Sequence, residues 1–447
     1  MRLKGINERI FNSEKFQNIL YNLDCEQKIN VCGLVSSSKS AIIYGIYKKT
    51  NKNIFVITSS NFEAKNMYED LKFYTDECIY FQGKENVFYN IEAFSSDLKW
   101  DRIKALKEIC NGSKKIICTS VDSLVSLYIN KETTKLLEVN LHINEDYGFN
   151  KFLENVHNLG YEKVYKVEQK GEYAVRGGII DIFPINSEFP YRIEFFGDSV
   201  DVIRSFNVVT QISIDNKETV RLIQAKEFIL KDNERNILYK NLEEDFYKYI
   251  ESINDLDIKN KLEEKFKLIL ERIKEFPFFD EYNVIIPYLQ EYFCDFFDFM
   301  DDSIVVVDEF KKCIETLDIL YERFQENFQM LMLRGEVLPC QIKLILDKGI
   351  LYKKINEVYD LKFSLFNESN SNSIVEFETK DTVKMDGKIN VILNEIKEKL
   401  SKNYSVVILS STKMRGEKLK ELLEEYDIKA YYDESLNKFN FGEVIIS

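Results

Sequence analysis

Residues 31–41 read VCGLVSSSKSA and come close to a phosphate-binding loop. The P-loop pattern G-x-x-x-x-G-K-[ST] is met at Gly33, Lys39 and Ser40, but Ser38 stands where the second glycine belongs. A working loop surrounds phosphate oxygens with backbone N–H groups and adds a lysine and a hydroxyl that holds Mg²⁺. The Cβ of Ser38 falls where the backbone must approach the phosphates most closely. The motif therefore predicts a degenerate nucleotide site without tight ATP binding.

A second part of such a site would be a strand that ends in acidic residues. The run SIVVVDEF supplies Asp308 and Glu309 at the end of an apolar stretch, where a pair that orients Mg²⁺ would stand. On the residues alone we favour the alternative, an ordinary buried strand with a solvated end. A third part, an arginine finger, is not visible, because no arginine-bearing motif follows SVVILSSTKMRGEKLKELL.

The sequence around the loop predicts the elements that would position it. Four short apolar runs in the first 120 residues read as buried strands, and two amphipathic stretches between them read as helices. The strands are KINVCG, NIFVITSS, CIYFQG and KKIICTS, and the helices are SAIIYGIYKKT and NFEAKNMYEDLKFY. This order predicts a parallel sheet with helices on both faces, whose first strand leads into the P-loop-like turn.

The pattern changes further along the chain. Alternating strands with glycine turns between about 150 and 210 predict an antiparallel unit, and the polar tract NESNSNS predicts a linker. We predict an α/β multidomain protein, in which a P-loop (RecA-like) parallel-sheet domain carries an inserted antiparallel α+β domain and is followed by a small α/β domain. The predicted ranges are 1–122 and 213–350 for the two parts of the P-loop-like domain, 123–212 for the insert, 351–373 for a linker, and 374–447 for the small domain, which we expect to be truncated.

Composition excludes several classes of function. The formal net charge is −14, with 61 Lys and Arg against 75 Asp and Glu, which is the wrong sign for a chain that mainly neutralises phosphates. There is no apolar run of about 18 residues to span a membrane and no signal peptide, so we expect a cytoplasmic protein. The eight cysteines form no C-x-x-C pair and only two histidines are present, so we expect neither a metal site nor histidine catalysis.

One long run carries a family resemblance. GEYAVRGGIIDIFPINSEFPYRIEFFGDSVDVIRSFNVVTQ, with its R-G-G-x-x-D-I-F-P and x-R-x-E-F-F-G-D motifs, strongly resembles the N-terminal module of bacterial transcription-repair coupling factors (Mfd), a module similar to the excision-repair subunit UvrB. Weaker similarity extends over the P-loop remnant, IVVVDEF and the small domain. UvrB has an intact P-loop and a long tyrosine-rich hairpin, whereas only FQGKENVFYNIEAFSSDLKWDRI stands in the place of that hairpin here. The resemblance is therefore to the coupling factors rather than to UvrB.

The resemblance implies a non-catalytic recruiting module. A coupling factor recognises a stalled RNA polymerase, displaces it with a C-terminal ATP-driven DNA translocase, and recruits UvrA through its UvrB-like module. This chain would then be the recruiting part, a monomer without a functional ATPase site or a cofactor of its own. RNA polymerase, duplex DNA, ATP and Mg²⁺ would be handled by the missing C-terminal part. The UvrA-binding residues of the family match Arg176, Arg192 and Phe196.

Strand periodicity gives these residues a surface position. In YRIEFF, Ile193 falls on one face, which we expect to be core, and Arg192 and Phe196 fall on the other. An exposed Phe beside arginine is typical of an interface hot spot. The alternative is that Phe196 covers a hairpin end and that the arginines are merely solvated.

Two other functions remain open from the sequence. An ATP-dependent helicase-like enzyme is favoured by Lys39, Ser40, Asp308 and Glu309 and opposed by Ser38. A damage-recognition subunit of the UvrB type is opposed by the missing hairpin.

Overall fold

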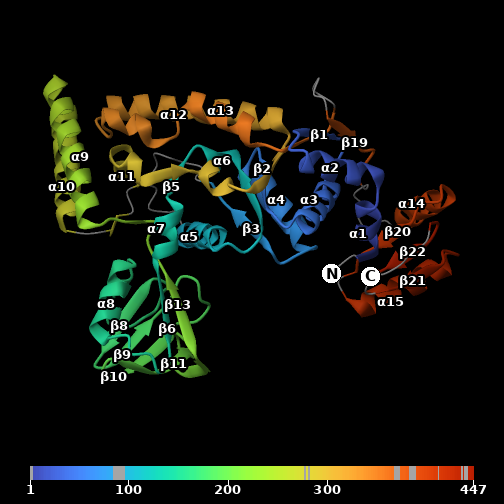
Figure 1. The fold of residues 1–447 in the computed structure, drawn as a ribbon, viewed down its shortest axis with the longest axis horizontal. Coiled ribbons are helices and arrows are strands. Elements are labelled where there is room, and N and C mark those ends of the chain that lie inside the picture. The colour runs from blue at the N-terminus through green and yellow to red at the C-terminus, as the bar shows by residue number, and fades with distance from the viewer. Residues whose placement is uncertain are drawn as a thin grey trace.

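The computed structural model describes residues 4–83, 96–275, 278–279, 282–366, 373–381, 389–410, 412–433, 436 and 441–447. Figure 1 shows a large α/β domain, an antiparallel unit that hangs below it, and a small unit beside the N-terminal helix. This arrangement confirms the predicted α/β multidomain fold class. Among the described residues, no helix is both long and apolar enough to cross a bilayer.

The large domain is built on a seven-stranded sheet whose neighbouring strands are all parallel. The predicted apolar runs form its strands β1 to β4, which confirms them. The order across the sheet is β19 (Ile374–Glu376), β1 (Ile29–Cys32), β18 (Leu361–Ser364), β17 (Ser303–Asp308), β2 (Asn53–Thr58), β4 (Ile116–Ser120) and β3 (Cys78–Phe81).

Helices cover both faces of this sheet, as the sequence predicts. Alternate residues of β2 enter different cores, with Ile54 and Val56 in one and Phe55 and Ile57 in the other. Burial on both sides explains why the strand runs are continuously apolar. The first face carries α1 (Lys4–Phe11), α2 (Glu14–Asp24), α3 (Ser37–Thr50) and α4 (Asn61–Lys72), and the second carries α12 (Phe310–Leu333) and α13 (Lys348–Val358).

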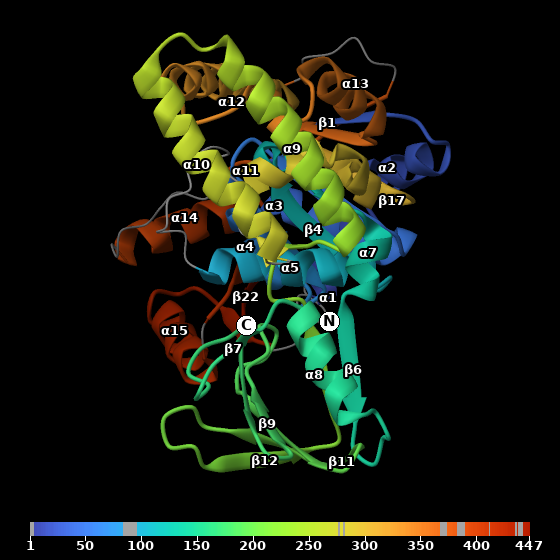
Figure 2. The ribbon, with the colours of Figure 1, turned by 90° about the vertical axis from the view of Figure 1, so that its left-hand side faces the viewer.

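The second core extends into a pair of long helices, α9 (Asp232–Ser252) and α10 (Leu256–Glu275), which Figure 2 shows side by side. Shorter elements complete the large domain. They are α5 (Ser96–Cys110), α6 (Val121–Leu124), β5 (Leu127–Ile129), α7 (Lys131–Leu136), β14 (Phe228–Ile229), β15 (Phe278–Phe279), α11 (Tyr282–Ile285), β16 (Phe293–Asp295), and the 3₁₀ helices η1 (Ile286–Tyr288), η2 (Gln290–Tyr292), η3 (Phe296–Met300) and η4 (Pro339–Leu344).

The inserted unit contains a six-stranded sheet packed on a helix and a two-stranded ribbon. Neighbouring strands of this sheet are antiparallel, except that β7 runs parallel to β8. The sheet order is β12 (Ser213–Lys217), β11 (Ser199–Phe206), β10 (Tyr191–Phe196), β9 (Ile179–Ile182), β8 (Glu172–Arg176) and β7 (Glu162–Lys163). One core joins it to α8 (Phe149–Asn158) and to the ribbon of β6 (Glu138–His142) and β13 (Thr219–Ile223).

The limits of this unit differ from the predicted range 123–212. Its core residues run mainly from 137 to 225, because β13 pairs with β6 and so returns the chain to the start of the unit. The residues just before it belong to the large domain, where β5 pairs with β16. Local patterns did not show these pairings, because each joins segments far apart in the sequence.

The predicted linker 351–373 is wrong over its first part. It contains most of α13 and all of β18, whose Leu361 and Phe363 are fully buried between β1 and β17. A strand of this length with alternating lysine and serine resembles a loop when read without its neighbours. Residues 367–372, most of the polar tract, lie outside the described residues.

The small unit is a three-stranded parallel sheet with helices. Its elements are α14 (Ile389–Ser401), β20 (Val406–Ile408), α15 (Lys413–Glu425), β21 (Ala430–Tyr432) and β22 (Val444–Ile446). β19 lies in the predicted range 374–447 but adds to the sheet of the large domain, next to β1. The predicted start of the small domain is therefore too early.

The core of the inserted unit gives a stability prediction. Ile193 is fully buried in it, so Ile193→Ala is expected to lower the free energy of unfolding by about 2–5 kcal/mol through lost burial and a cavity. Urea unfolding measures this. Ile214→Ala, the same change at an exposed position of β12, should shift the midpoint little, and equal losses from both changes would contradict this packing.

Candidate functional site

Two predicted partner-binding residues meet at one end of the six-stranded sheet. Arg176 ends β8 and Phe196 ends β10, each directly before a glycine turn. Since these antiparallel hairpins turn at the same end, the turn after Arg176 lies against β10, where Phe195 N–H donates to Gly178 O at 2.8 Å. The pleat therefore brings Arg176 and Phe196 to a common rim of the sheet.

The two faces of β10 are as the period-2 pattern predicts. Ile193 and Phe195 lie in the core under α8, whereas Phe196 is 85% exposed. An aromatic side chain of this size costs free energy to leave in water. Its position on a rigid strand end also fixes its direction, so a partner would immobilise few torsions when it binds.

Arg192 is less exposed than the sequence suggests. Its Nε and Nη2 donate to the two carboxylate oxygens of Asp181 at 2.7 and 2.9 Å, and its guanidinium carbon lies 4.9 Å from the centre of the Phe206 ring. Asp181 is 4% exposed and lies opposite Arg192 on β9. This two-point ion pair holds Arg192 in one orientation, so it is neither simply solvated nor freely movable.

The structure adds Tyr165, a residue that the sequence analysis did not single out. It is 93% exposed, its carbonyl accepts a hydrogen bond from Arg176 Nη2 at 3.4 Å, and its ring centre lies 5.9 Å from the guanidinium carbon. Val164 and Val167 on either side pack in a small cluster with buried Ala174. These valines anchor the segment on the sheet and turn Tyr165 outward. The local signal for this is the pair of valines that encloses Tyr165 and Lys166 in VYKV.

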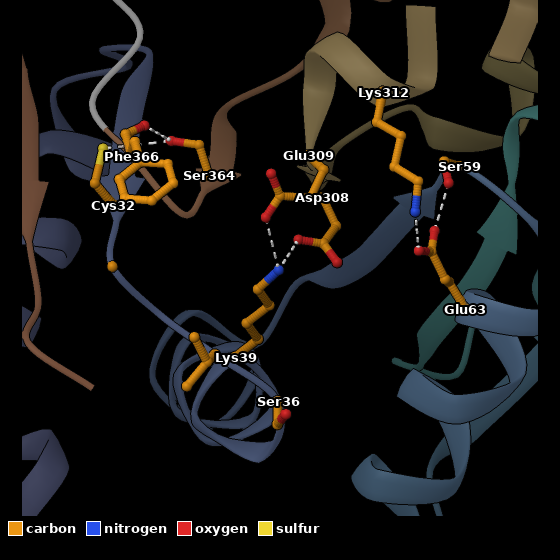
Figure 3. A network of polar contacts seen from close by, with 12 residues as sticks. Cys32, Ser36, Lys39, Ser59, Glu63, Asp308, Glu309, Lys312, Ser364 and Phe366 are labelled. Carbon is orange, nitrogen blue, oxygen red and sulfur yellow. Dashed lines mark hydrogen bonds and ion pairs between the residues drawn. The ribbon is translucent and has the colours of Figure 1, made fainter. Parts of the chain in front are cut away.

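The P-loop remnant brings together three of the residues predicted for a nucleotide site. Figure 3 shows Lys39 from α3 reaching across to the end of β17, where its Nζ lies 2.6 Å from Asp308 Oδ1 and 3.1 Å from Glu309 Oε1. In the same view Lys312 pairs with Glu63. Asp308 is therefore not at the solvated strand end that we favoured from the residues alone, and the lysine is already bonded to carboxylates.

Burial and charge act in opposite directions on this pair. Burial lowers the pKa of Lys39, but the carboxylates of Asp308 and Glu309 outweigh it, and the net pKa lies above its usual value. Burial raises the pKa of Asp308, and the ammonium group of Lys39 offsets only part of this rise. The pair is stable as a unit, whereas either charge alone in this position is costly.

The side chains at the remaining P-loop positions bond within the protein. Gly33 adopts φ +75° at the end of β1. Ser38 Oγ accepts a hydrogen bond from Val35 N–H at 2.9 Å and donates to the carbonyl of the same residue. Ser40 is fully buried, and its hydroxyl contacts Met67 Sδ at 3.3 Å. The side chain of Ser40 therefore points toward α4.

Comparison with known proteins gives two findings. Residues 139–228 match the family model described as the UvrB interaction domain, the range that the inserted unit occupies. The chain is also similar to the transcription-repair-coupling factor of Bacillus subtilis (strain 168), 26% identical over 99% of this chain and 38% of that protein. The transcription-repair-coupling factor of Staphylococcus haemolyticus (strain JCSC1435) is 27% identical over 99% of this chain and 38% of that protein. The one of Staphylococcus aureus (strain USA300) is 28% identical over 89% of this chain and 34% of that protein.

Over nearly its whole length the chain is similar to transcription-repair-coupling factors. This confirms the resemblance read from the sequence, and the interaction-domain match covers Arg176, Arg192 and Phe196. The chain spans 38% of the length of the first two relatives. Residues 84–95, part of the segment compared with the UvrB hairpin, lie outside the described residues.

The buried ion pair of Lys39 and Asp308 gives a prediction that depends on pH. Lys39→Met leaves Asp308 buried without its cation, and we expect a loss of about 3–5 kcal/mol in the free energy of unfolding near pH 7. The folded-state pKa of Asp308 then rises further above its unfolded value. A carboxyl with a raised folded pKa destabilises fully above that pKa and not at all below the unfolded-state pKa, so the loss relative to wild type should shrink as the pH falls from 7 toward about 4.

Thermal melts of both proteins across this pH range test the prediction. Lys312→Met is the matched control, because Lys312 and its partner Glu63 are far more exposed and their pair is worth about 1 kcal/mol or less. Equal losses for the two variants, or a loss at Lys39 that grows as the pH falls, would show that the pair is not the buried element described here.

Proposed function

We propose that the inserted unit recruits UvrA, as part of a coupling factor that acts at stalled RNA polymerase. The observation that carries the proposal is Phe196, an 85% exposed aromatic on the rim of a rigid sheet, within the segment that matches the UvrB interaction domain. Arg176 stands on the same rim. RNA polymerase, duplex DNA and ATP would be engaged by parts of the protein beyond this chain.

The geometry supports a compact hot spot rather than a broad contact. Phe196 offers an apolar anchor, and Arg176 with Tyr165 offers a guanidinium and an aromatic ring at its side. Such a set fits an apolar pocket with a carboxylate at its edge on the partner. Arg192 supplies a second guanidinium on the same sheet. Asp181 on the neighbouring strand β9 fixes its orientation, and it lies two residue pairs away from the rim.

We further propose that this chain does not hydrolyse ATP. A helicase-like enzyme would need Lys39 to be available to phosphates and Ser40 to face the metal. Here Lys39 is bonded to Asp308 and Glu309, and Ser40 is buried against Met67. These contacts weigh against the enzyme alternative and in favour of a scaffold that presents the inserted unit.

The interface predicts a loss of UvrA binding without a loss of folding. Phe196→Ala and Arg176→Ala should each weaken UvrA capture by about 2 kcal/mol or more, roughly thirtyfold, because both side chains are exposed hot-spot types. Affinity measured by biolayer interferometry beside thermal melts decides this. Arg192→Ala is a poorer probe, because it also leaves buried Asp181 unpaired and should lower the melting temperature.

Matched substitutions on the large domain serve as controls. Phe62 is exposed on α4 and Arg323 is exposed on α12, so Phe62→Ala and Arg323→Ala remove the same groups elsewhere. Both should bind UvrA at wild-type strength. The assigned surface is wrong if Phe196→Ala melts normally and binds as well as Phe62→Ala does.

Restoring the glycine of the P-loop tests the second proposal. Ser38→Gly removes the Cβ and the hydroxyl that bonds to Val35, yet it leaves Lys39 paired and Ser40 buried. We expect steady-state ATP hydrolysis at background level for both wild type and Ser38→Gly. Turnover above background in the wild-type chain, abolished by Lys39→Ala, would contradict the proposal.

A further inference from the structure

The P-loop remnant is covered by a segment of the chain itself. After β19 the backbone continues in an extended form through residues 377–381, which we call the strap. Phe377 N–H donates to Cys32 O at 2.8 Å, and Thr379 N–H donates to Gly33 O at 3.2 Å. The strap therefore follows the end of β1 directly into the loop.

Side chains of the strap bond to the groups that a phosphate would meet. Thr379 Oγ1 accepts a hydrogen bond from Val35 N–H at 2.9 Å and donates to Gly33 O at 2.7 Å. Asp381 Oδ1 accepts from Ser36 Oγ at 2.5 Å, directly before the first turn of α3. A loop N–H thus has a hydroxyl partner, and a carboxylate stands at the start of the helix, where an anion is favoured.

The strap also explains why residue 33 is glycine. A Cβ at Gly33 would lie 2.0 Å from the carbonyl oxygen of Phe377, and the φ of +75° is strained for other residues. Along the strap, Thr379 and Asp381 bond to the loop, whereas Glu378 and Lys380 between them are exposed. Contacts at every second residue are typical of an extended segment that packs against its neighbour on one side.

We propose that the strap is a permanent internal ligand of the P-loop remnant, in which a threonine hydroxyl and an aspartate carboxylate take the positions of nucleotide phosphate oxygens. The loop has become a docking site for extended peptide rather than for a nucleotide. This role does not depend on UvrA recruitment. It concerns how the large domain holds the chain that leads to the small unit.

A second contact is consistent with such an anchoring role. Gly5 N–H of α1 donates to Leu436 O at 2.6 Å, and the guanidinium carbon of Arg9 lies 4.5 Å from the centre of the Phe441 ring. Figure 1 shows the small unit beside α1, on the side of the large domain that carries β1 and β19. α1 therefore contacts the small unit directly, while the strap fixes to the large domain the chain that precedes it.

Amide hydrogen exchange on the whole chain tests the proposal. Thr379→Val with Asp381→Asn keeps the shape of the strap but removes its hydroxyl and its charge. Exchange at residues 33–38 should become roughly fivefold to tenfold faster, as expected for lost hydrogen bonds. The matched control, Glu378→Gln with Lys380→Gln, changes exposed strap residues and should leave this exchange unchanged. Equal exchange in the two double variants would overturn the proposal.

A measurement on the wild-type chain keeps the proposal testable if the first variant folds poorly. Millimolar ATP with Mg²⁺, or inorganic phosphate, should leave exchange at residues 33–38 and 377–381 unchanged, because the strap is not displaced. Protection of 33–38 accompanied by faster exchange at 377–381 would show that the strap is a lid over a working site. UvrA affinity should be the same for wild type and both double variants, so failure here is separable from failure of the UvrA proposal.

Discussion

The buried ion pair between Lys39 and Asp308 is the interaction around which the large domain is arranged. It joins the start of α3 to the end of β17 across β18, and so connects three neighbouring strands of the parallel sheet at their carboxyl ends. In open α/β sheets this edge is the usual place for a ligand. Here the charges that would serve a ligand neutralise each other, because an unpaired charge at this depth would destabilise the fold.

The large domain and the inserted unit differ in how they treat the groups that a ligand or partner could contact. The large domain satisfies the polar groups of its P-loop remnant internally, through the ion pair, Ser38 and the strap. The inserted unit does the opposite and leaves Phe196 and Tyr165 in water on one rim of its sheet. Exposed aromatic side chains on this rim fit the partner-binding role that we propose for the unit. The match to the UvrB interaction domain falls on this unit and not on the P-loop remnant.

Sequence patterns predicted this structure wherever neighbours along the chain decide the outcome. Strands β1 to β4 and the two faces of β10 follow from the periodicity of the apolar residues. The sequence did not predict that Ser40 points into α4, or that Asp181 holds Arg192, because these depend on side chains brought in by distant segments. β18 was missed for the same reason, since a short strand becomes recognisable only between its partners.

The limits of the inserted unit were misplaced by a similar cause. The pairing of β6 with β13 joins residues 138–142 to 219–223, and no local signal marks a pairing over such a separation. The exposure of Tyr165 likewise depends on contacts with other strands. Its exposure depends on Val164 and Val167 packing against Ala174, a contact across the sheet.

The most direct test of the account is a hydrogen-exchange footprint of UvrA on the whole chain. If this rim recruits UvrA, the two hairpin turns that follow Arg176 and Phe196 and the segment around Tyr165 become protected, while α12 and the P-loop remnant are unchanged. Protection centred on the large domain, with both turns exchanging as in the unbound chain, would contradict it.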